Sequence, residues 1–223
     1  MATLNDAVDL IRRELRGKSD VDVRGEFNAA FPDAIETFVR LMAPAFLEWD
    51  EFDRALTGDK RQSIVSALMF TAISLHTQSM KLLLSGHAVP AGNLSRQVVE
   101  TIALALLCSN SDHEILDSFD GDCYSTSYAV TDLRKRSDAL GVRREGVDAL
   151  VLAQKFYHKY SHPSKMTLGT VMEFADTGRF FVGGSFDSSK IQVYREEIEG
   201  RLSLASQFRN FVLVVRANLS RWR

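Results

Sequence analysis

The chain has 223 residues, of which 45% are hydrophobic, and its acidic and basic side chains nearly balance at a net charge of −2. This length and apolar content predict one domain, residues 1–223, with a substantial core. The interspersed charges exclude a bulk attraction to nucleic acid or to an anionic membrane, but they leave a local basic patch open.

The cysteines and the apolar runs indicate the compartment. Cys108 and Cys123 are too few for a disulfide scaffold and favour a reducing environment. The N-terminus lacks an apolar signal segment, and the longest apolar run, residues 98–108, is interrupted by Glu100 and is far shorter than the roughly 20 residues that cross a bilayer. We therefore expect a cytoplasmic protein without a membrane partner.

The N-terminal region predicts a peripheral element. Residues 4–16 carry apolar side chains at helical spacing, which indicates a short amphipathic helix. Residues 17–31 combine glycines and charges without a sustained period, which is typical of a loop. We expect residues 1–31 to form a helix and a loop at the edge of the domain.

Two longer helices follow in the sequence. Pro32 suits a first helical turn, and the helix that it begins should run to about residue 56. Pro44 lies inside this helix and predicts a kink or a break into two helices. Asp59 then opens a long core helix that Gly86 ends.

The central helix, residues 85–109, organises the whole chain. It is hydrophobic around its full circumference, which predicts burial on every side. Glu100 therefore needs a partner, because a lone buried carboxylate would cost several kcal/mol or take up a proton. Arg96, one turn earlier on the same ridge, can reach it.

The segment 145–162 carries the second informative pattern. Projected on a helix, one side begins apolar and becomes polar over its last two turns. The polar residues on this side are Gln154, His158, Ser161 and His162. Pro163 ends the helix and places His162 near its unsatisfied carbonyl groups, so the pattern indicates a site or a wet helix end.

The C-terminal region predicts one irregular insertion and one long helix. Residues 170–186 contain two runs of β-branched and aromatic residues around Asp176 and Gly178, which is the signal of a small hairpin. From Ser189 to Leu219 apolar residues keep helical spacing over many turns. The predicted fold class is all-α: a helical bundle of about six to eight helices with one small β-hairpin insertion.

No motif of a common enzyme class is present: the sequence lacks a glycine-rich phosphate loop, a C-x-x-C pair, an H-E-x-x-H helix and a G-x-S-x-G elbow. His158 and His162, four residues apart, could bind a metal with Glu100 as a third ligand. The alternative is that the two histidines bind no metal: His162 caps the end of the helix, and His158 is a solvated surface residue. We expect no metal and no cofactor.

Two stretches resemble motifs of a known family. LLLSGHAVPAGNLSRQVVE is similar to the helix L-L-x-x-G…A…L-x-R-x-x-x-E, and YHKYSHPSK to the helix end Y-x-x-x-S-x-H-P-S, of uncharacterised bacterial helical proteins related to the HEPN superfamily (higher eukaryotes and prokaryotes nucleotide-binding). The resemblance covers about residues 60–170. It implies a helical bundle, often dimeric, and for many members a metal-independent ribonuclease of toxin–antitoxin or phage-defence systems.

The nuclease motif of that superfamily is R-x(4-6)-H. His162 matches its histidine, but residues 155–157 are Lys, Phe and Tyr rather than Arg. What the resemblance implies here is a polar pocket between two helices. The candidate binding residues are Arg96, Glu100, Tyr157, His158, Ser161 and His162.

Three functions are compatible with this pattern. The preferred one is binding of a small anionic or nucleotide-like ligand, with Arg96 on a phosphate and His162 as a hydrogen-bond donor or acid/base, unless the cluster only fixes the fold. The first alternative is an RNA-cleaving effector in which His162 activates a ribose 2′-hydroxyl and Arg96 stabilises the phosphate. The second is a homodimeric scaffold joined through the apolar stripe of the C-terminal helix.

Overall fold

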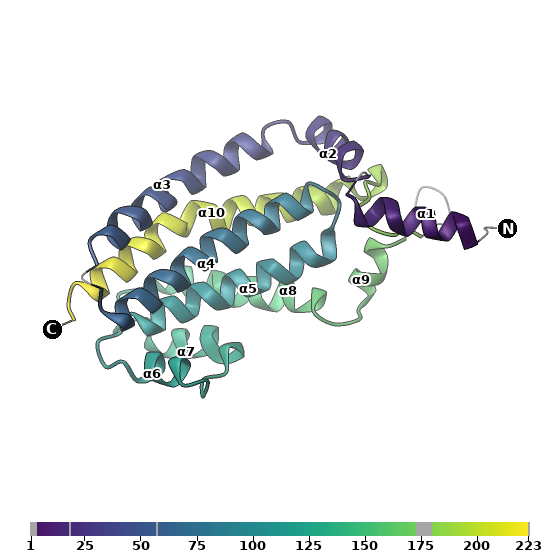
Figure 1. Cartoon of the computed structure of the whole chain (residues 1–223). Coiled ribbons are helices and arrows are strands. Elements are labelled where there is room, and N and C mark those ends of the chain that lie inside the picture. The colour runs from purple at the N-terminus through teal and green to yellow at the C-terminus, as the bar shows by residue number, and fades with distance from the viewer. Residues whose placement is uncertain (1–3, 18, 57, 173–179, 223) are drawn as a thin grey trace.

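The computed structural model describes residues 4–17, 19–56, 58–172 and 180–222, and within them the chain forms ten α-helices, three 3₁₀-helices and no β-strand (Figure 1). The all-α class is confirmed, whereas the helix count exceeds the six to eight expected. The helices are α1 (Leu4–Leu15), α2 (Ser19–Ala30), α3 (Ala34–Arg54), α4 (Lys60–Leu83), α5 (Ala88–Cys108), α6 (Glu114–Asp120), η1 (Thr126–Tyr128), α7 (Ala129–Arg136), α8 (Arg144–Tyr157), η2 (His158–Tyr160), α9 (Lys165–Thr170), η3 (Ser188–Lys190) and α10 (Ile191–Leu219).

Helix α5 is the centre of the bundle, as the sequence predicts. From Val98 to Cys108 every side chain is buried except Glu100 and Thr101, which are partly exposed. Helix α4 packs along α5, and α10 packs against α3, α4 and α5. Figure 1 shows α6 and α7 at the end of the bundle near the C-terminus, and α1, α2 and α9 at the opposite end. None of the described helices is both long and apolar enough to cross a membrane.

The segment expected as an N-terminal loop is largely helical, which corrects the prediction for residues 1–31. Residues 19–30 form α2, and its Val23 and Phe27 are buried in the common core. Phe27 lies against the rings of Phe186 and Tyr194, with centroids 5.0 and 4.8 Å away. This packing outweighs the roughly 1 kcal/mol by which a glycine such as Gly25 weakens a helix. Helix α1 is peripheral, as expected, and has no buried residue.

Helix α3 continues through Pro44, so of the two predicted outcomes, a kink or a break into two helices, the break does not occur. Pro44 and Arg40, whose carbonyl group loses its helical donor, are both exposed. Water can therefore satisfy the freed carbonyl oxygen, and the buried residues on the opposite side of α3 hold both halves on the bundle.

The hairpin predicted for residues 170–186 is not confirmed. Its expected turn lies within residues 173–179, outside the described residues. On either side of that gap, Met172 and Phe180 form an isolated antiparallel bridge, and the Phe181 N–H donates to the Val171 carbonyl at 2.9 Å. Helix α9 ends at Thr170, the first residue of the predicted insertion.

Candidate functional site

Arg96 and Glu100 form the ion pair that their spacing predicts. Arg96 Nε donates to Glu100 Oε1 at 2.9 Å, and the two side chains are only 22% and 14% exposed. Gln154 of α8 donates to the same carboxylate oxygen at 3.2 Å and to the Ser127 carbonyl at 3.4 Å. The pair therefore ties α5 to α8 and to η1.

His158, Ser161 and His162 lie on the surface beyond the end of α8. All three are exposed, and the two imidazole rings lie against each other with centroids 4.6 Å apart. In the described part of the chain no hydrogen bond or ion pair joins His162 to Arg96 or Glu100. Before His162, α8 ends at Tyr157 and continues as a 3₁₀ turn, which changes the period from 3.6 to 3.0 residues per turn.

Two tyrosines, one at the end of α8 and one at the end of η2, are buried instead. Tyr157 and Tyr160, three residues apart, are both buried. The Tyr160 hydroxyl donates to Glu197 Oε1 at 2.5 Å, and the Arg201 guanidinium lies 5.5 Å from the Tyr157 ring centroid. Of the predicted site residues, Tyr157 alone belongs to this interior cluster.

Glu197 and Arg201 of α10 form a buried ion pair that the sequence analysis missed. Arg201 Nη1 donates to Glu197 Oε2, and Arg201 Nε donates to Ser79 Oγ at 2.9 Å. The two side chains are 2% and 1% exposed. Burial works to lower the pKa of Arg201, but Tyr157 and Glu197 outweigh it and leave that pKa raised, so Arg201 stays charged. The same i, i+4 spacing that revealed Arg96 and Glu100 was present here.

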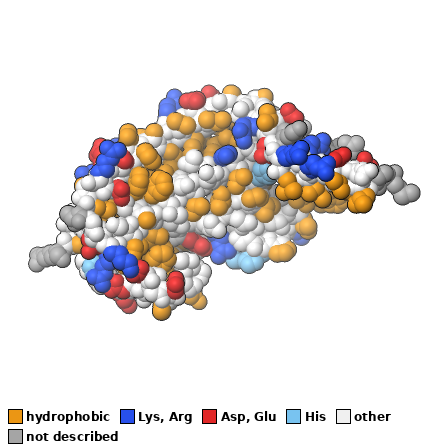
Figure 2. All heavy atoms as spheres, in the orientation of Figure 1, with side chains coloured by type: hydrophobic (Ala, Val, Ile, Leu, Met, Phe, Trp, Pro, Cys, Tyr) orange, Lys and Arg blue, Asp and Glu red, His pale blue; other side chains and the backbone are white. Residues whose placement is uncertain are grey.

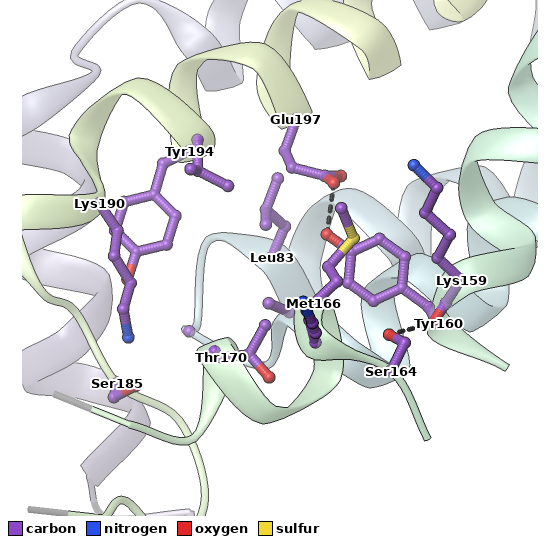
Figure 3. Close-up of a pocket in the computed structure, with 15 residues that line it drawn as sticks. Leu83, Lys159, Tyr160, Ser164, Met166, Thr170, Ser185, Lys190, Tyr194 and Glu197 are labelled. Atoms are coloured by element: carbon purple, nitrogen blue, oxygen red, sulfur yellow. Dashed lines mark hydrogen bonds between the residues drawn. The ribbon is translucent and has the colours of Figure 1, made fainter. Parts of the chain in front are cut away.

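A cavity of about 540 Å³ lies beside this cluster, bounded by η2, α9, the first turns of α10 and the turn between α4 and α5. Figure 3 shows Tyr160 and Glu197 at one side of it, joined by their hydrogen bond, with Leu83 and Met166 nearby. Its volume falls within the roughly 300–1,000 Å³ of small-molecule sites. The lining residues are Leu83, Gly86, Ala88, Lys159, Tyr160, Ser164, Lys165, Met166, Gly169, Thr170, Ser185, Lys190, Val193, Tyr194 and Glu197.

Close backbone approaches set the walls of the cavity. A Cβ atom on Gly92 of α5 would come within 2.3 Å of the Tyr160 ring, so only glycine lets this ring lie on the helix. Gly86 has a φ of +81°, and a Cβ there would come within 2.4 Å of the Ser185 backbone nitrogen. The GHAVPAG stretch of the quoted motif thus allows both Tyr160 and the Ser185 backbone to pack closely at the cavity.

Positive charge surrounds the cavity. Lys159 and Lys165 are exposed lining residues, and neither forms an ion pair with a carboxylate of the described residues. Lys190 is 8% exposed, donates to the Met172 carbonyl and forms an ion pair with Asp187 at 3.5 Å. Residues 149–172, which supply two of these lysines, contain no Asp or Glu. The YHKYSHPSK motif therefore borders the cavity through Lys159, Tyr160, Ser164 and Lys165 rather than through the predicted Ser161 and His162.

In the described ranges no three His, Cys, Asp or Glu side chains are placed to hold a metal ion, and the two histidines of the predicted pair lack a third ligand there. Comparison with protein-family models, with curated proteins and with solved structures gave no match. The chemistry of the cavity is therefore the basis for the function.

Proposed function

We propose that this protein binds a small organic anion, nucleotide-like molecules included, in the cavity between η2, α9 and α10. The observation that carries the proposal is that two exposed lysines without carboxylate partners in the described chain, Lys159 and Lys165, border a cavity of about 540 Å³. An ammonium group is a point charge that attracts carboxylate or phosphate groups. We assign the anion contact to these lysines rather than to Arg96, whose guanidinium is already paired with Glu100.

The test is a calorimetric titration of the full chain with two organic anions, adenosine monophosphate and decanoate. The variant Lys159→Ala/Lys165→Ala should weaken binding by about tenfold, because each solvent-exposed charge contributes about 0.2–1 kcal/mol. The control Lys81→Ala/Lys155→Ala removes two exposed lysines that do not line the cavity and should leave binding unchanged. Absence of binding of both anions by the wild-type chain refutes the proposal.

We also propose that the chain is a bacterial, HEPN-like protein. The two stretches that carry the resemblance meet in the fold, since Tyr160 of the second lies on Gly92 of the first. The same reading favours the cytoplasm as its compartment, with both cysteines unpaired in the structure.

A second candidate function is metal-independent RNA cleavage on the adjacent surface. His158 and His162, with ring centroids 4.6 Å apart, lie in the segment 149–172, which is free of acidic residues. Imidazoles serve as acid and base near neutral pH, and cleavage through the ribose 2′-hydroxyl needs one of each. Lys155 and Lys159 flank them and would attract the phosphate backbone.

Cleavage of a labelled single-stranded RNA in the presence of a chelator tests this function. His158→Ala and His162→Ala should each abolish cleavage. The control His87→Ala should not, because the His87 imidazole is engaged with the Asp20 carboxylate, 3.0 Å from it. Cleavage that survives both substitutions comes from a contaminating nuclease and rejects the assignment.

We further propose a homodimer, formed through α1 rather than through α10. The apolar stripe of α10 is buried in the core of the monomer. Helix α1 instead exposes a stripe at helical spacing, visible in Figure 2 as hydrophobic side chains along one side of the α1 region. The stripe consists of Leu4, Val8, Ile11 and Leu15, which are 81%, 41%, 53% and 84% exposed.

The charges of α1 favour a second copy as its partner. Asp6 and Asp9 lie in its first half, and Arg12, Arg13, Glu14 and Arg16 follow, with a net positive charge. An antiparallel copy therefore places the acidic half of one helix beside the more basic half of the other. Light scattering over a dilution series should show a dimer that Ile11→Ser/Leu15→Ser abolishes and Leu152→Ser, on exposed α8 surface, preserves. A constant monomer mass contradicts this interface.

A further inference from the structure

The side chains that face the cavity are mainly hydrocarbon. Leu83, Ala88, Met166, Val193 and Tyr194 line it. Figure 3 shows Leu83 and Met166 between Lys190 on one side and Lys159 on the other. A ligand body that fills this space must therefore exchange water for apolar contacts, which favours a body without polar atoms.

Two hydroxyl groups of the wall, those of Ser164 and Thr170, already donate within the protein. Ser164 Oγ donates to the Lys159 carbonyl at 2.9 Å, and Thr170 Oγ1 donates to the Thr167 carbonyl at 2.7 Å. A ribose or a base brings several hydroxyl and amide groups that need partners of their own. The hydroxyl groups of Ser164 and Thr170 have no hydrogen left to donate, so they can pair with few polar groups of a ribose or a base.

The acid in the described wall is similarly engaged. Glu197 Oε1 accepts from the Tyr160 hydroxyl at 2.5 Å, and Oε2 accepts from Arg201. Burial, together with the Glu197 charge, raises the pKa of Tyr160, which keeps its proton on the hydroxyl. Arg201 balances the charge of Glu197 and Tyr160 donates to it, so the carboxylate has little capacity left to accept from a sugar hydroxyl.

We propose that the ligand is an amphiphilic anion with a hydrocarbon body, of the class of medium-chain fatty acids, with its carboxylate at Lys159 and Lys165 and its chain along Leu83 and Val193. This inference rests on the proposed function, since it names the chemical class of the anion. Both halves of the ligand are needed: the lysines act on the carboxylate, and the apolar wall acts on the chain.

Calorimetric titration of the full chain with three probes tests the inference: decanoate, the uncharged decanol, and adenosine monophosphate. We expect decanoate to bind about tenfold or more tightly than either of the others, since decanol lacks the charge and the nucleotide lacks the apolar body. Nucleotide binding that equals or exceeds decanoate binding overturns the hydrocarbon assignment but keeps the proposed function. Failure of both anions to bind overturns both.

Two variants separate the contributions of chain and charge. Val193→Asn places an amide in the wall at a half-exposed position that tolerates substitution, and it should weaken decanoate binding by about tenfold. Leu152→Asn, on exposed surface outside the cavity, is its control. Equal decanoate affinities in these two variants would show that the hydrocarbon chain of the ligand binds elsewhere. An unchanged ratio of decanoate to decanol affinity in Lys159→Ala/Lys165→Ala would show that the two lysines do not contact the carboxylate.

Discussion

The ring of Tyr160 lies on the backbone of Gly92, so close that a Cβ atom at residue 92 would be 2.3 Å from the Tyr160 Cγ atom. This approach holds η2 against α5 and directs the Tyr160 hydroxyl to Glu197. The position of one glycine in the central helix thus decides where a wall of the cavity stands.

We expect Gly92→Ala to destabilise the protein by about 1–3 kcal/mol, because the new methyl group must displace a buried ring. Urea unfolding followed by circular dichroism measures the loss. Gly200→Ala in α10 is the matched control: its Cβ would meet the Tyr157 hydroxyl at an ordinary 3.6 Å, so the better helix propensity of alanine should stabilise by up to about 1 kcal/mol. Equal effects of the two substitutions would contradict the tight contact at Gly92.

The ion pairs Arg96–Glu100 and Glu197–Arg201 should differ in how much the loss of the arginine lowers the free energy of unfolding. Arg201→Met leaves the Glu197 carboxylate buried without its cation, and we expect a loss of about 3–5 kcal/mol in the free energy of unfolding. Arg96→Met leaves Glu100 partly hydrated and still bonded to Gln154, so that loss should be about 1 kcal/mol or less. Chemical denaturation of both variants decides, and a larger loss for Arg96→Met would place the principal buried pair on α5 instead.

His76 makes the stability depend on pH. Its Nε2–H donates to the Arg201 carbonyl at 3.0 Å, its ring is stacked on Phe208, and burial lowers its pKa from 6.5 to about 3. Below pH 6.5 the His76 imidazole takes up a proton in the unfolded chain, whereas in the folded chain it stays neutral. The contribution of neutral His76 to stability is therefore present above pH 6.5 and is lost as the pH falls toward 3.

Between pH 7 and pH 5 the His76 contribution should fall by about 2 kcal/mol, given 1.36 kcal/mol per pH unit below the unfolded pKa. The free energies of unfolding of wild type and His76→Gln at both pH values isolate the His76 contribution. On acidification the variant should lose about 2 kcal/mol less stability than the wild type. Parallel slopes for wild type and His76→Gln would show that His76 takes up its proton equally in the folded and the unfolded chain.

The long periodic elements could be predicted from the sequence because their own burial pattern determines them. The continuous apolar surface of α5 and the cap at Asp59, whose side chain accepts from the Gln62 N–H at 3.0 Å, are both found. Helix α2 was missed because its two core contacts, Val23 and Phe27, stand among charges and a glycine and are stabilised by distant aromatic residues.

The candidate site was less predictable for a geometric reason. Arg96 and Glu100 meet because a single helix fixes their distance. After Tyr157 the chain continues as a 3₁₀ turn, which a helical projection does not foresee; Tyr160 in this turn is buried, whereas His162 beyond it is exposed. The cavity itself arises where η2, α9 and α10 meet, and no local pattern encodes that meeting.

The affinity of decanoate for charge-reversed chains tests the central claim most directly. Calorimetry should show binding to the wild type and to the control Lys81→Glu/Lys155→Glu, and at least about a tenfold loss in Lys159→Glu/Lys165→Glu, which carries the same net charge as the control. Equal affinities of the two variants would contradict an anion site at this cavity.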